Sequence, residues 1–505
     1  MSGKVYLVGA GPGDPGLFTL KGKRALEQAD VVIYDFLANR ELLRFTRPRC
    51  ESLCVGKRPG EPTSSQEEIN QLLISKAARG MTVVRLKGGD PFIFGRGGEE
   101  AQALARAGIP FEVVPGISSG YAAPAYAGIP VTHREIASSV AFLTGHEDPS
   151  KPSTSVDWSK LATGPRTLVL FMAVRNLPEI TAALIQQGRE PSTPVAVIRW
   201  GTRAAQEVVT GTLADISGKA QHVEPPAVTV IGEVVQMREE LNWFEHLPLF
   251  GKRIVTTRTR QQAGTLRELL EELGAETIEI PAIEIHDPES WEPFDAALHR
   301  LESFDYLLLT SANGVRSFLQ RLTALKRDVR DLKGLKIGAI GPATAAEFAK
   351  VGIRVDFVPH EYRAEGLLES LQGVDIREKS FLIPRAKVAR DLLPATLTER
   401  GAHVEVVECY ETVQPAFSPG ELARLLTPRP DVITFTSSST VTNFLRLVQD
   451  KDLHPLLDGA TLASIGPITS RTIREHGLQV SIEAEHSTIP GLIEAIQKHF
   501  ALSKK

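Results

Sequence analysis

The sequence has few cysteines, few aromatic residues and no long apolar run. Its 505 residues include only three cysteines, Cys50, Cys54 and Cys409, which are too few for a disulfide framework. No CxxC pair or paired histidine accompanies them, so we interpret them as reduced thiols and expect no metal site. No apolar stretch approaches the ~18 residues that a membrane span needs. We therefore expect no membrane partner.

The chain also lacks an excess of charge of either sign. Its formal net charge is −4 at pH 7, with 57 lysines and arginines against 61 aspartates and glutamates. This balance gives no indication of a nucleic-acid partner or of an anionic membrane surface. The opening residues MSGKVYLV enter an apolar strand at once, which leaves no room for a signal peptide. We expect a cytoplasmic protein.

Strand and helix signals alternate along the whole chain, which predicts an α/β protein with mainly parallel sheets. The best domain boundary is the stretch NWFEHLPLFGK, residues 242–252, between a helix predicted for 235–241 and a strand predicted for 253–257. We predict a first half over 1–245, with lobes of about 1–115 and 116–245. A second half is predicted over 250–505.

The second half contains an internal repeat. Three pairs of segments echo one another in order: 253–285 with 380–412, 307–322 with 433–448, and 337–355 with 462–480. Each unit reads as strand and helix, so the repeat predicts two similar α/β lobes that face a cleft.

The opening loop follows an apolar strand, and its glycines are Gly9, Gly11 and Gly13. A second strand, 31–34, ends at Asp35. This arrangement is typical of a dinucleotide site, but the spacing is G-x-G-x-G-D instead of G-x-G-x-x-G. A nicotinamide-dependent oxidoreductase therefore stays open as one interpretation.

Two further glycine-rich loops lie in the first half. One is VVRLKGGDPFIFGRGGEE (83–100), and the other is VVPGISSGYAAPAYAGIPVTHR (113–134). Glycine lets the backbone approach a ligand closely, and open α/β sheets bind ligands at the rim where such loops gather. Three loops of this kind in one half predict a ligand site there.

These blocks, together with Gly9-Ala-Gly-Pro-Gly-Asp14, resemble the uroporphyrinogen-III C-methyltransferases, which are tetrapyrrole methylases, over about 4–243. The second half is similar to uroporphyrinogen-III synthase over about 249–503, through its architecture and the short motifs TSSSTV and IGPITS. The resemblance implies a two-lobed tetrapyrrole methylase fold, followed by a two-lobed synthase-like α/β fold.

The resemblance also implies a bifunctional enzyme. Its second half would close hydroxymethylbilane to uroporphyrinogen III. Its first half would methylate that product at C2 and C7 to precorrin-2 with S-adenosylmethionine, on the way to siroheme or cobalamin. A homodimer through the methyltransferase half is expected. A methyltransferase with a non-catalytic, tetrapyrrole-sensing second half remains an alternative, because two-lobed clefts are common among binding proteins.

By motif position, the family's cofactor residues fall on nine positions of this sequence. They are Pro12, Gly88, Gly89, Asp90, Ile93, Ser118, Ser119, Met172 and Gly201. The backbone and the aspartate would hold the polar parts of S-adenosylmethionine, and the apolar side chains would pack around its adenine.

Three residues correspond to the family's candidate catalytic groups. Asp35 matches the base that draws off a pyrrole N–H proton, and Lys57 matches the proton donor. Tyr410 corresponds to the tyrosine proposed to help water leave during ring closure. Serines and threonines at strand ends would line the synthase cleft or simply cap helices; they are Thr310, Ser311, Thr436, Ser437 and Ser438.

The substrate carries eight carboxylates, so cations must gather locally although the chain is slightly acidic. The candidates in or beside the motif blocks are Arg58, Arg85, Lys87, Arg96 and Arg134.

From the repeat and the resemblance we predict a discontinuous lobe of about 250–283 with 414–505, and an inserted lobe of about 287–404. The strand at Arg253 should then join the sheet that holds 433–436. Two crossovers near Ile285 and Tyr410 should run side by side.

Overall fold

The computed structural model describes residues 3–56, 65–146, 156–258, 260–415, 417–449, 455 and 458–502. The chain divides into two compact units. One comprises 1–253 with 269–277 and 497–505, and the other comprises 254–268 with 278–496. Within the described ranges, no helix is long and apolar enough to cross a membrane. The boundaries of the two predicted halves, 1–245 and 250–505, remain a prediction.

The first sheet is entirely parallel, as expected, in the order β3-β2-β4-β1-β5. Its strands are β1 (Lys4–Gly9), β2 (Val31–Tyr34), β3 (Glu51–Cys54), β4 (Thr82–Lys87) and β5 (Phe111–Val114). All four residues of β2 are buried, as is typical of a strand that is covered on both faces. Because the strands are parallel, the loops that follow them all leave from one edge.

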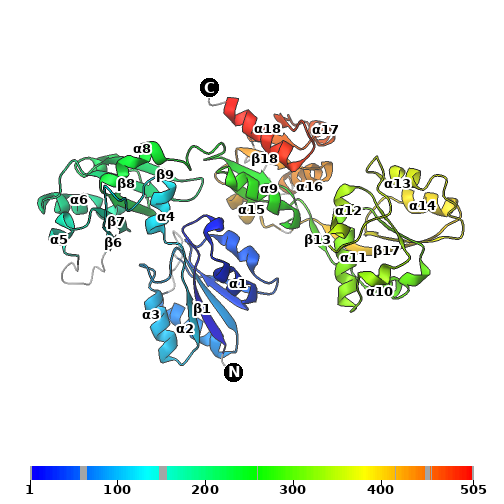
Figure 1. Ribbon diagram of the computed structural model, residues 1–505, viewed down its shortest axis with the longest axis horizontal. Helices are drawn as coiled ribbons and strands as arrows, with labels where there is room; N and C mark the ends of the chain where they lie inside the picture. The colour runs from blue at the N-terminus through cyan, green and yellow to red at the C-terminus, as the bar shows by residue number, and fades with distance from the viewer. Residues whose placement is uncertain are drawn as a thin grey trace. The chain divides into compact units, whose positions relative to one another are not determined.

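Helices cover both faces of this sheet, with α1 on one side and α2 and α3 on the other (Figure 1). They are α1 (Leu20–Gln28), α2 (Gln66–Ala78) and α3 (Gly97–Arg106). Leu26 of α1 packs on one face, whereas Leu73 of α2 and Leu104 of α3 pack on the other. The helix α1 begins at Leu20, because the hydroxyl of Thr19 just before it accepts a hydrogen bond from the Gly22 amide at 3.0 Å.

The second sheet has the order β6-β7-β10-β8-β9. Its strands are β6 (Val140–Thr144), β7 (Thr167–Phe171), β8 (Pro194–Arg199), β9 (Glu207–Thr212) and β10 (Ala227–Ile231). Only β6 and β7 pair in parallel, and the other pairs are antiparallel. The expectation of mainly parallel sheets is therefore wrong here. The loop between β8 and β9 is short, which antiparallel strands permit and parallel strands do not.

The helices of this lobe are α4 (Ser119–Tyr126), α5 (Trp158–Thr163), α6 (Leu177–Gln186) and α7 (Ile216–Lys219). The helix predicted for 235–241 is a 3-10 helix over Glu233–Met237 that continues into α8 (Arg238–Leu241).

The second half contains two further sheets, with orders β12-β11-β18-β19-β20 and β13-β17-β16-β14-β15. Their strands are β11 (Arg253–Thr256), β12 (Glu276–Glu279), β13 (Glu284–His286), β14 (Tyr306–Leu309), β15 (Lys336–Ala339), β16 (Ser380–Ala386), β17 (His403–Val413), β18 (Val432–Phe435), β19 (Thr461–Ser464) and β20 (Ile482–Glu483). The helices are α9 (Arg260–Glu272), α10 (Glu292–His299), α11 (Ala312–Ala324), α12 (Pro342–Ala349), α13 (Ala364–Ser370), α14 (Leu392–Glu399), α15 (Pro419–Leu425), α16 (Ser438–Gln449), α17 (Pro467–Glu475) and α18 (Ile489–Leu502).

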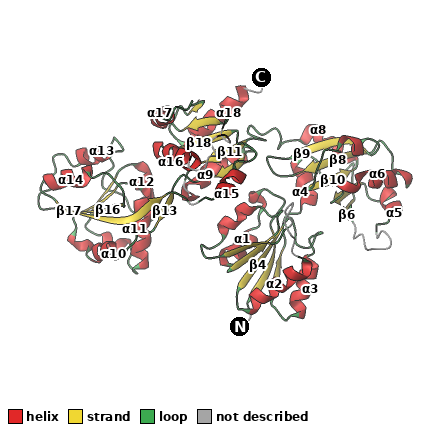
Figure 2. Cartoon of the chain, turned by 180° about the vertical axis from the view of Figure 1, so that it is seen from behind, coloured by secondary structure: helices red, strands yellow, loops and turns green. Residues whose placement is uncertain are grey.

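Helices lie on both faces of the sheet that contains β16 and β17 (Figure 2). Phe294 of α10 and Phe318 of α11 pack in the core on one face. Leu367 of α13 and Leu397 of α14 pack in the core on the other face. This sheet is therefore the middle layer of three.

The pairing of β11 agrees with the prediction from the repeat. Ile254 of β11 pairs in parallel with Val432 of β18, and the Arg253 strand does not join the sheet of β15. The two crossovers also lie side by side, since Ile285 of β13 pairs with Thr412 of β17 in antiparallel register. The strands β12 and β13 are separated at Pro281, which has no N–H to donate to a sheet.

Candidate functional site

The three glycine-rich loops of the first half meet at the carboxyl edge of the first sheet. Gly11, after β1, and Gly89, after β4, exchange two backbone hydrogen bonds of 3.2 and 2.8 Å. The loop after β5 joins them through the Gly116 amide, which donates to Asp90 Oδ2 at 3.0 Å. The sequence prediction that these loops gather at one rim is thus confirmed for their backbones.

The loops approach so closely that glycine is required at their contacts. A Cβ atom at Gly9 would lie 2.5 Å from the Gly116 Cα, and one at Gly116 would lie 2.3 Å from the Gly89 carbonyl oxygen. Gly89 also has φ of +65°, in the left-handed region that favours glycine. Backbone groups, and not side chains, therefore form the floor of this edge.

Asp90 organises two of these loops. Its Oδ1 accepts a hydrogen bond from the Phe92 amide at 2.8 Å, and its Oδ2 accepts the one from Gly116. A carboxylate has about four acceptor sites, so both oxygens keep capacity for a ligand. Asp90 thus lies where the sequence places it, but it also holds the loop after β4 against the loop after β5.

The opening loop, which follows β1, is also held by residues that could not be identified from the sequence. Tyr126 donates to Asp14 Oδ2 at 2.7 Å, Asn39 Nδ2 donates to the Gly13 carbonyl at 2.7 Å, and the Asp14 amide donates to Thr202 Oγ1 at 3.1 Å. These contacts fix the chain on the C-terminal side of Pro12. Burial, followed by the hydrogen bond to Asp14, raises the pKa of Tyr126, so its hydroxyl keeps the proton that it donates.

The remaining predicted cofactor residues lie on neighbouring elements. Ser118 caps α4 by accepting from the Gly120 amide at 3.3 Å. A Cβ at Gly89 would lie 4.0 Å from the Ser118 Cα and 3.9 Å from the Ser119 amide nitrogen. Ser118 and Ser119 are therefore beside the second glycine loop, as predicted.

The loop after β4 also contacts the end of β7. The rings of Phe94, next to Ile93, and Phe171, next to Met172, have centroids 5.0 Å apart. Met172 has φ of +55° and is 50% exposed. Gly201 packs against α4, because a Cβ there would lie 2.3 Å from the Ala123 Cβ. The loop that contains Ile93 therefore lies beside the end of β7, next to Met172, and Gly201 packs against α4.

This neighbourhood fits S-adenosylmethionine chemically. Large apolar side chains are exposed on the loops after β2, β4 and β7, which lie around this site; they are Leu37, Phe92, Phe94 and Met172. Backbone groups and the Asp90 carboxylate lie beside them. A ligand with an aromatic base, an amino-acid group and ribose hydroxyls matches this combination.

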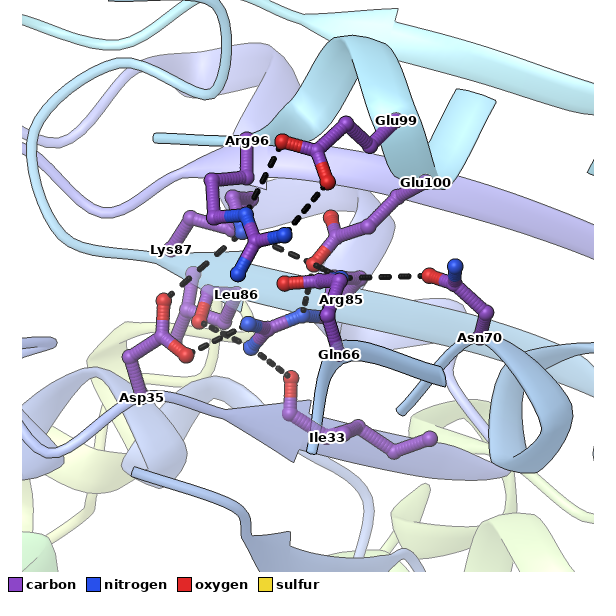
Figure 3. Close-up of polar contacts among 10 residues, drawn as sticks. All are labelled: Ile33, Asp35, Gln66, Asn70, Arg85, Leu86, Lys87, Arg96, Glu99 and Glu100. Carbon is purple, nitrogen blue, oxygen red and sulfur yellow. Dashed lines mark hydrogen bonds and ion pairs between the residues drawn. The ribbon is translucent and has the colours of Figure 1, made fainter. Parts of the chain in front are cut away.

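Asp35 follows β2 at the same edge, and two cations of β4 hold it (Figure 3). Arg85 Nη2 lies 2.5 Å from Asp35 Oδ1, and Lys87 Nζ lies 3.9 Å from Oδ2. The Asp35 side chain is 28% exposed, so the carboxylate remains accessible from outside. A paired yet accessible carboxylate at this edge is consistent with the predicted catalytic position.

Arg85 and Lys87 do not have the role that the sequence analysis gave them. Their side chains are 2% and 4% exposed, so they are not available to pair with substrate carboxylates. Both lie on the face of β4 under α3, where Glu100 pairs with each of them. Burial, followed by the charge of Arg85, lowers the pKa of Lys87. Although burial opposes its charge, Asp35 and Glu100 raise the pKa of Arg85.

Of the other predicted residues, Lys57 and Arg58 lie outside the described residues. Arg96 is exposed and pairs with Glu99, with Arg96 Nη2 and Glu99 Oε2 2.6 Å apart. Arg134 is exposed. Arg96 and Arg134 therefore remain candidates for the substrate's carboxylates.

In the second half, Tyr410 and Ser311 meet. Their hydroxyl oxygens are 2.9 Å apart, on β17 and at the start of α11. The Ser311 Oγ also accepts from the Gly314 amide at 2.9 Å, so this serine is both a helix cap and a partner of the tyrosine. Tyr410 is 8% exposed, and burial raises the pKa of its phenol.

Two of the other predicted hydroxyls, those of Ser437 and Ser438, cap or brace helices. The Ser437 Oγ accepts from the Thr440 amide at 3.3 Å, and the Ser438 Oγ accepts from Thr472 Oγ1 at 2.8 Å. Among the described residues, no group of three or more His, Cys, Asp or Glu side chains could hold a metal ion.

Comparisons with known proteins give the family of each half. The model of the tetrapyrrole (corrin/porphyrin) methylases matches residues 4–217, and the model of uroporphyrinogen-III synthase HemD matches residues 264–494.

Two relatives match most of this chain, and a third matches less than half of it. The uroporphyrinogen-III C-methyltransferase of Bacillus subtilis (strain 168) is 40% identical, over 85% of this chain and 90% of its own length. The porphyrin biosynthesis protein HemD of Ruminiclostridium josui is 36% identical, over 98% of this chain and 97% of its own. The uroporphyrinogen-III C-methyltransferase of Priestia megaterium is 54% identical, over 46% of this chain and 98% of its own. The chain therefore belongs to the tetrapyrrole methylases through its first half and to the uroporphyrinogen-III synthases through its second.

Proposed function

We propose that this chain is a bifunctional enzyme of tetrapyrrole biosynthesis. Its second half closes hydroxymethylbilane to uroporphyrinogen III, and its first half methylates that product at C2 and C7 to precorrin-2. The observation that carries the proposal is the meeting of three glycine loops beside the accessible carboxylate of Asp35, in a chain that belongs to both families.

The cofactor of the first half is S-adenosylmethionine, which supplies a methyl group on a sulfonium. The residues proposed to hold it are those of the three loops and of the ends of β7 and β8: Pro12, Gly88, Gly89, Asp90, Ile93, Ser118, Ser119, Met172 and Gly201. Asp90 suits the polar end of the ligand because its two oxygens are already oriented by the Phe92 and Gly116 amides. The role of these loops is to bind, to orient and to exclude water.

Asp35 acts in this proposal as the base. A pyrrole carbon becomes a better nucleophile as its N–H proton is removed, and a carboxylate at the rim can accept that proton. Arg85 and Lys87 fix the carboxylate in place while part of it stays exposed. We propose Lys57 as the proton donor.

Tyr410 acts in ring closure. Water leaves the bilane as the reactive cation forms, and a phenol can donate a proton to the departing hydroxyl. The raised pKa of Tyr410 keeps its phenol protonated at neutral pH, and Ser311 orients it. The phenol proton and the hydroxyl leave together as water, and the proton that the attacked pyrrole carbon releases on ring closure restores the phenol.

Three further points belong to the same proposal. They are a homodimer formed through the first half, a cytoplasmic location, and domains of 1–245 and 250–505. The second half would comprise the lobes 250–283 with 414–505, and 287–404. The parallel pairing of β11 with β18 supports this lobe assignment. Light scattering on the purified full chain would test for the dimer.

The test is to incubate the full chain with hydroxymethylbilane, with and without S-adenosylmethionine, and to identify products by chromatography and mass spectrometry. We expect a cyclic product with the inverted ring in both cases, and two added methyl groups only with the cofactor. Asp35→Asn should slow methylation alone, and Tyr410→Phe should slow closure alone.

Two results would overturn the proposal in favour of the alternatives. A chain that methylates added uroporphyrinogen III but leaves the bilane open would be a methyltransferase with a sensing half. Saturable binding of NADH without binding of S-adenosylhomocysteine would indicate an oxidoreductase.

A further inference from the structure

Glu100 is a fully buried carboxylate behind the Asp35 site. It lies in the first turn of α3 and is 0% exposed. Its Oε1 accepts hydrogen bonds from Arg85 Nε at 3.0 Å and from Lys87 Nζ at 2.8 Å (Figure 3). Gln66 Nε2 approaches the same oxygen at 3.4 Å from α2. One oxygen atom therefore joins both cations of β4.

The two cations then reach the two oxygens of Asp35 separately. Arg85 Nη2 contacts Oδ1, and Lys87 Nζ lies 3.9 Å from Oδ2. Arg85 Nη1 also donates to the backbone carbonyls of Ile33 and Leu86, each at 3.4 Å. The planar guanidinium is thus held along several directions, with Glu100 on one side and Asp35 on the other.

The four charges of this cluster balance: two cations face two carboxylates. A buried ion pair is favourable only when its charges and hydrogen bonds are complete. Without the charge of Glu100, Arg85 and Lys87 would have only Asp35 as an anionic partner in the cluster. The Lys87 ammonium, now 3.9 Å away, would then close on Asp35 Oδ2 and draw the carboxylate inward.

We propose that Glu100 is a positioning residue for methyl transfer. By holding Arg85 and Lys87 on its Oε1, it keeps Lys87 at the longer distance of 3.9 Å from Asp35 Oδ2, so that this oxygen can still accept a proton from the substrate. The inference rests on the proposed function of Asp35 as the base. Glu100 itself does not touch substrate, because it is completely buried.

The experiment uses the full chain with uroporphyrinogen III and S-adenosylmethionine. Glu100→Gln keeps the size of the side chain but removes its charge. We expect kcat for methylation to fall by about tenfold, part of the ~10²–10⁴-fold that general base catalysis contributes. KM for uroporphyrinogen III and the Kd of S-adenosylmethionine should stay within about twofold of the parent values. A twofold change corresponds to only about 0.4 kcal/mol of binding free energy.

A matched control is Glu67→Gln, a glutamate in the first turn of α2, which packs on the same face of the sheet as α3. Its side chain is exposed, and its Oε1 accepts a hydrogen bond from Gln71 Nε2 at 2.9 Å. It removes the same charge from the first turn of a helix and lies outside the proposed site, so kcat should be unchanged. An equal loss of kcat in both variants would overturn the inference, because helix charge alone would then explain it.

The decisive readout is a double-mutant cycle with Asp35→Asn. If Glu100 acts through Asp35, Glu100→Gln should cause no further loss in the Asp35→Asn background. An equal fold-loss in both backgrounds would overturn the positioning role. Full methylation activity of the Asp35→Asn single variant would instead overturn the proposed role of Asp35 as the base. That result is distinct from a failure of the Glu100 inference, because it does not involve Glu100.

Should Glu100→Gln unfold, Glu100→Asp provides a second variant. It keeps the charge, but a carboxylate that is one methylene shorter cannot reach Arg85 Nε and Lys87 Nζ together as Glu100 does. We expect a folded protein with reduced kcat and unchanged cofactor affinity. A kcat equal to that of the parent would overturn the inference.

Discussion

The Tyr126 hydroxyl lies 2.7 Å from Asp14 Oδ2 and ties α4 to the loop that follows β1. A hydrogen bond to a charged group contributes about 1.5–3 kcal/mol. We predict that Tyr126→Phe loosens the first loop and weakens S-adenosylmethionine binding several-fold, as measured by calorimetry. Tyr121→Phe is the control, because Tyr121 lies on the same helix and is 38% exposed. Unchanged affinity in Tyr126→Phe would show that the loop holds its position without this contact.

Asp90 offers a second test of the cofactor site. Asp90→Ala removes the acceptor of the Phe92 and Gly116 amides together with a charged acceptor for the ligand. We predict that cofactor binding weakens by ~1.5–3 kcal/mol, the usual contribution of such hydrogen bonds. Asp35→Asn should leave cofactor affinity nearly intact, and it serves as the comparison. If Asp90→Ala binds the cofactor as tightly as the parent does, Asp90 is not part of the site.

Tyr410 and Ser311 provide the test for the second half. Tyr410→Phe removes the phenol that lies 2.9 Å from the Ser311 hydroxyl, and we predict slower ring closure with the methylation of added uroporphyrinogen III unchanged. Ser311→Ala should have a smaller effect of the same kind. Tyr306→Phe makes the same chemical change on β14, where the ring stacks on Phe381. If Tyr410→Phe and Tyr306→Phe slow ring closure equally, Tyr410 has no specific role in closure.

Acid stability of the first sheet should depend on Glu112. Lys21 and Lys4 both pair with this residue, with Lys4 Nζ 2.6 Å from Glu112 Oε2, and they lower its pKa from 4.5 to about 2. Because the folded-state pKa lies below the unfolded one, the stabilisation is present above about pH 4.5 and is lost as pH falls toward 2. The gap in Tm between the parent and Glu112→Gln should therefore shrink between pH 6 and pH 3.

Glu27→Gln is the control for this pH series. Glu27 is an exposed carboxylate whose Oε1 lies 3.7 Å from Lys23 Nζ, a looser ion pair. A Tm gap for Glu112→Gln that stays constant over the whole range would contradict the linkage.

Much of the first sheet could be predicted from the sequence. The strand at Val31–Tyr34 matches its prediction residue for residue, because a continuous apolar run between polar residues is typical of a buried parallel strand. The directions of β8, β9 and β10 could not be predicted in this way. Apolar periodicity gives the faces of a strand, but it does not give the direction of its neighbours.

The glycine loops of the candidate site were also predictable, because glycine is needed where backbones touch. The partners of single side chains were not. Asp14 and Tyr126 are 112 positions apart, and no local pattern connects them. The sequence predicts that Arg85 and Lys87 pair with substrate carboxylates, because it does not show that α3 places Glu100 over them. In both cases the partner of a side chain depends on how distant segments of the chain pack together, and no local sequence pattern shows this packing.

The contact of Gly9, Gly89 and Gly116 limits how this sequence can change. Any side chain at Gly9 or Gly116 would collide with the backbone of another loop, at distances of 2.3–2.6 Å. No single replacement can be accommodated by the rotation of a neighbouring side chain, since the obstacle is main chain in each case. Gly9 and Gly116 therefore form one mutational unit, whereas Gly89 is restricted only by its positive φ. In a library that varies one position at a time, Gly9 and Gly116 should accept no substitution. A different residue at either position would require the exchange of whole loops together.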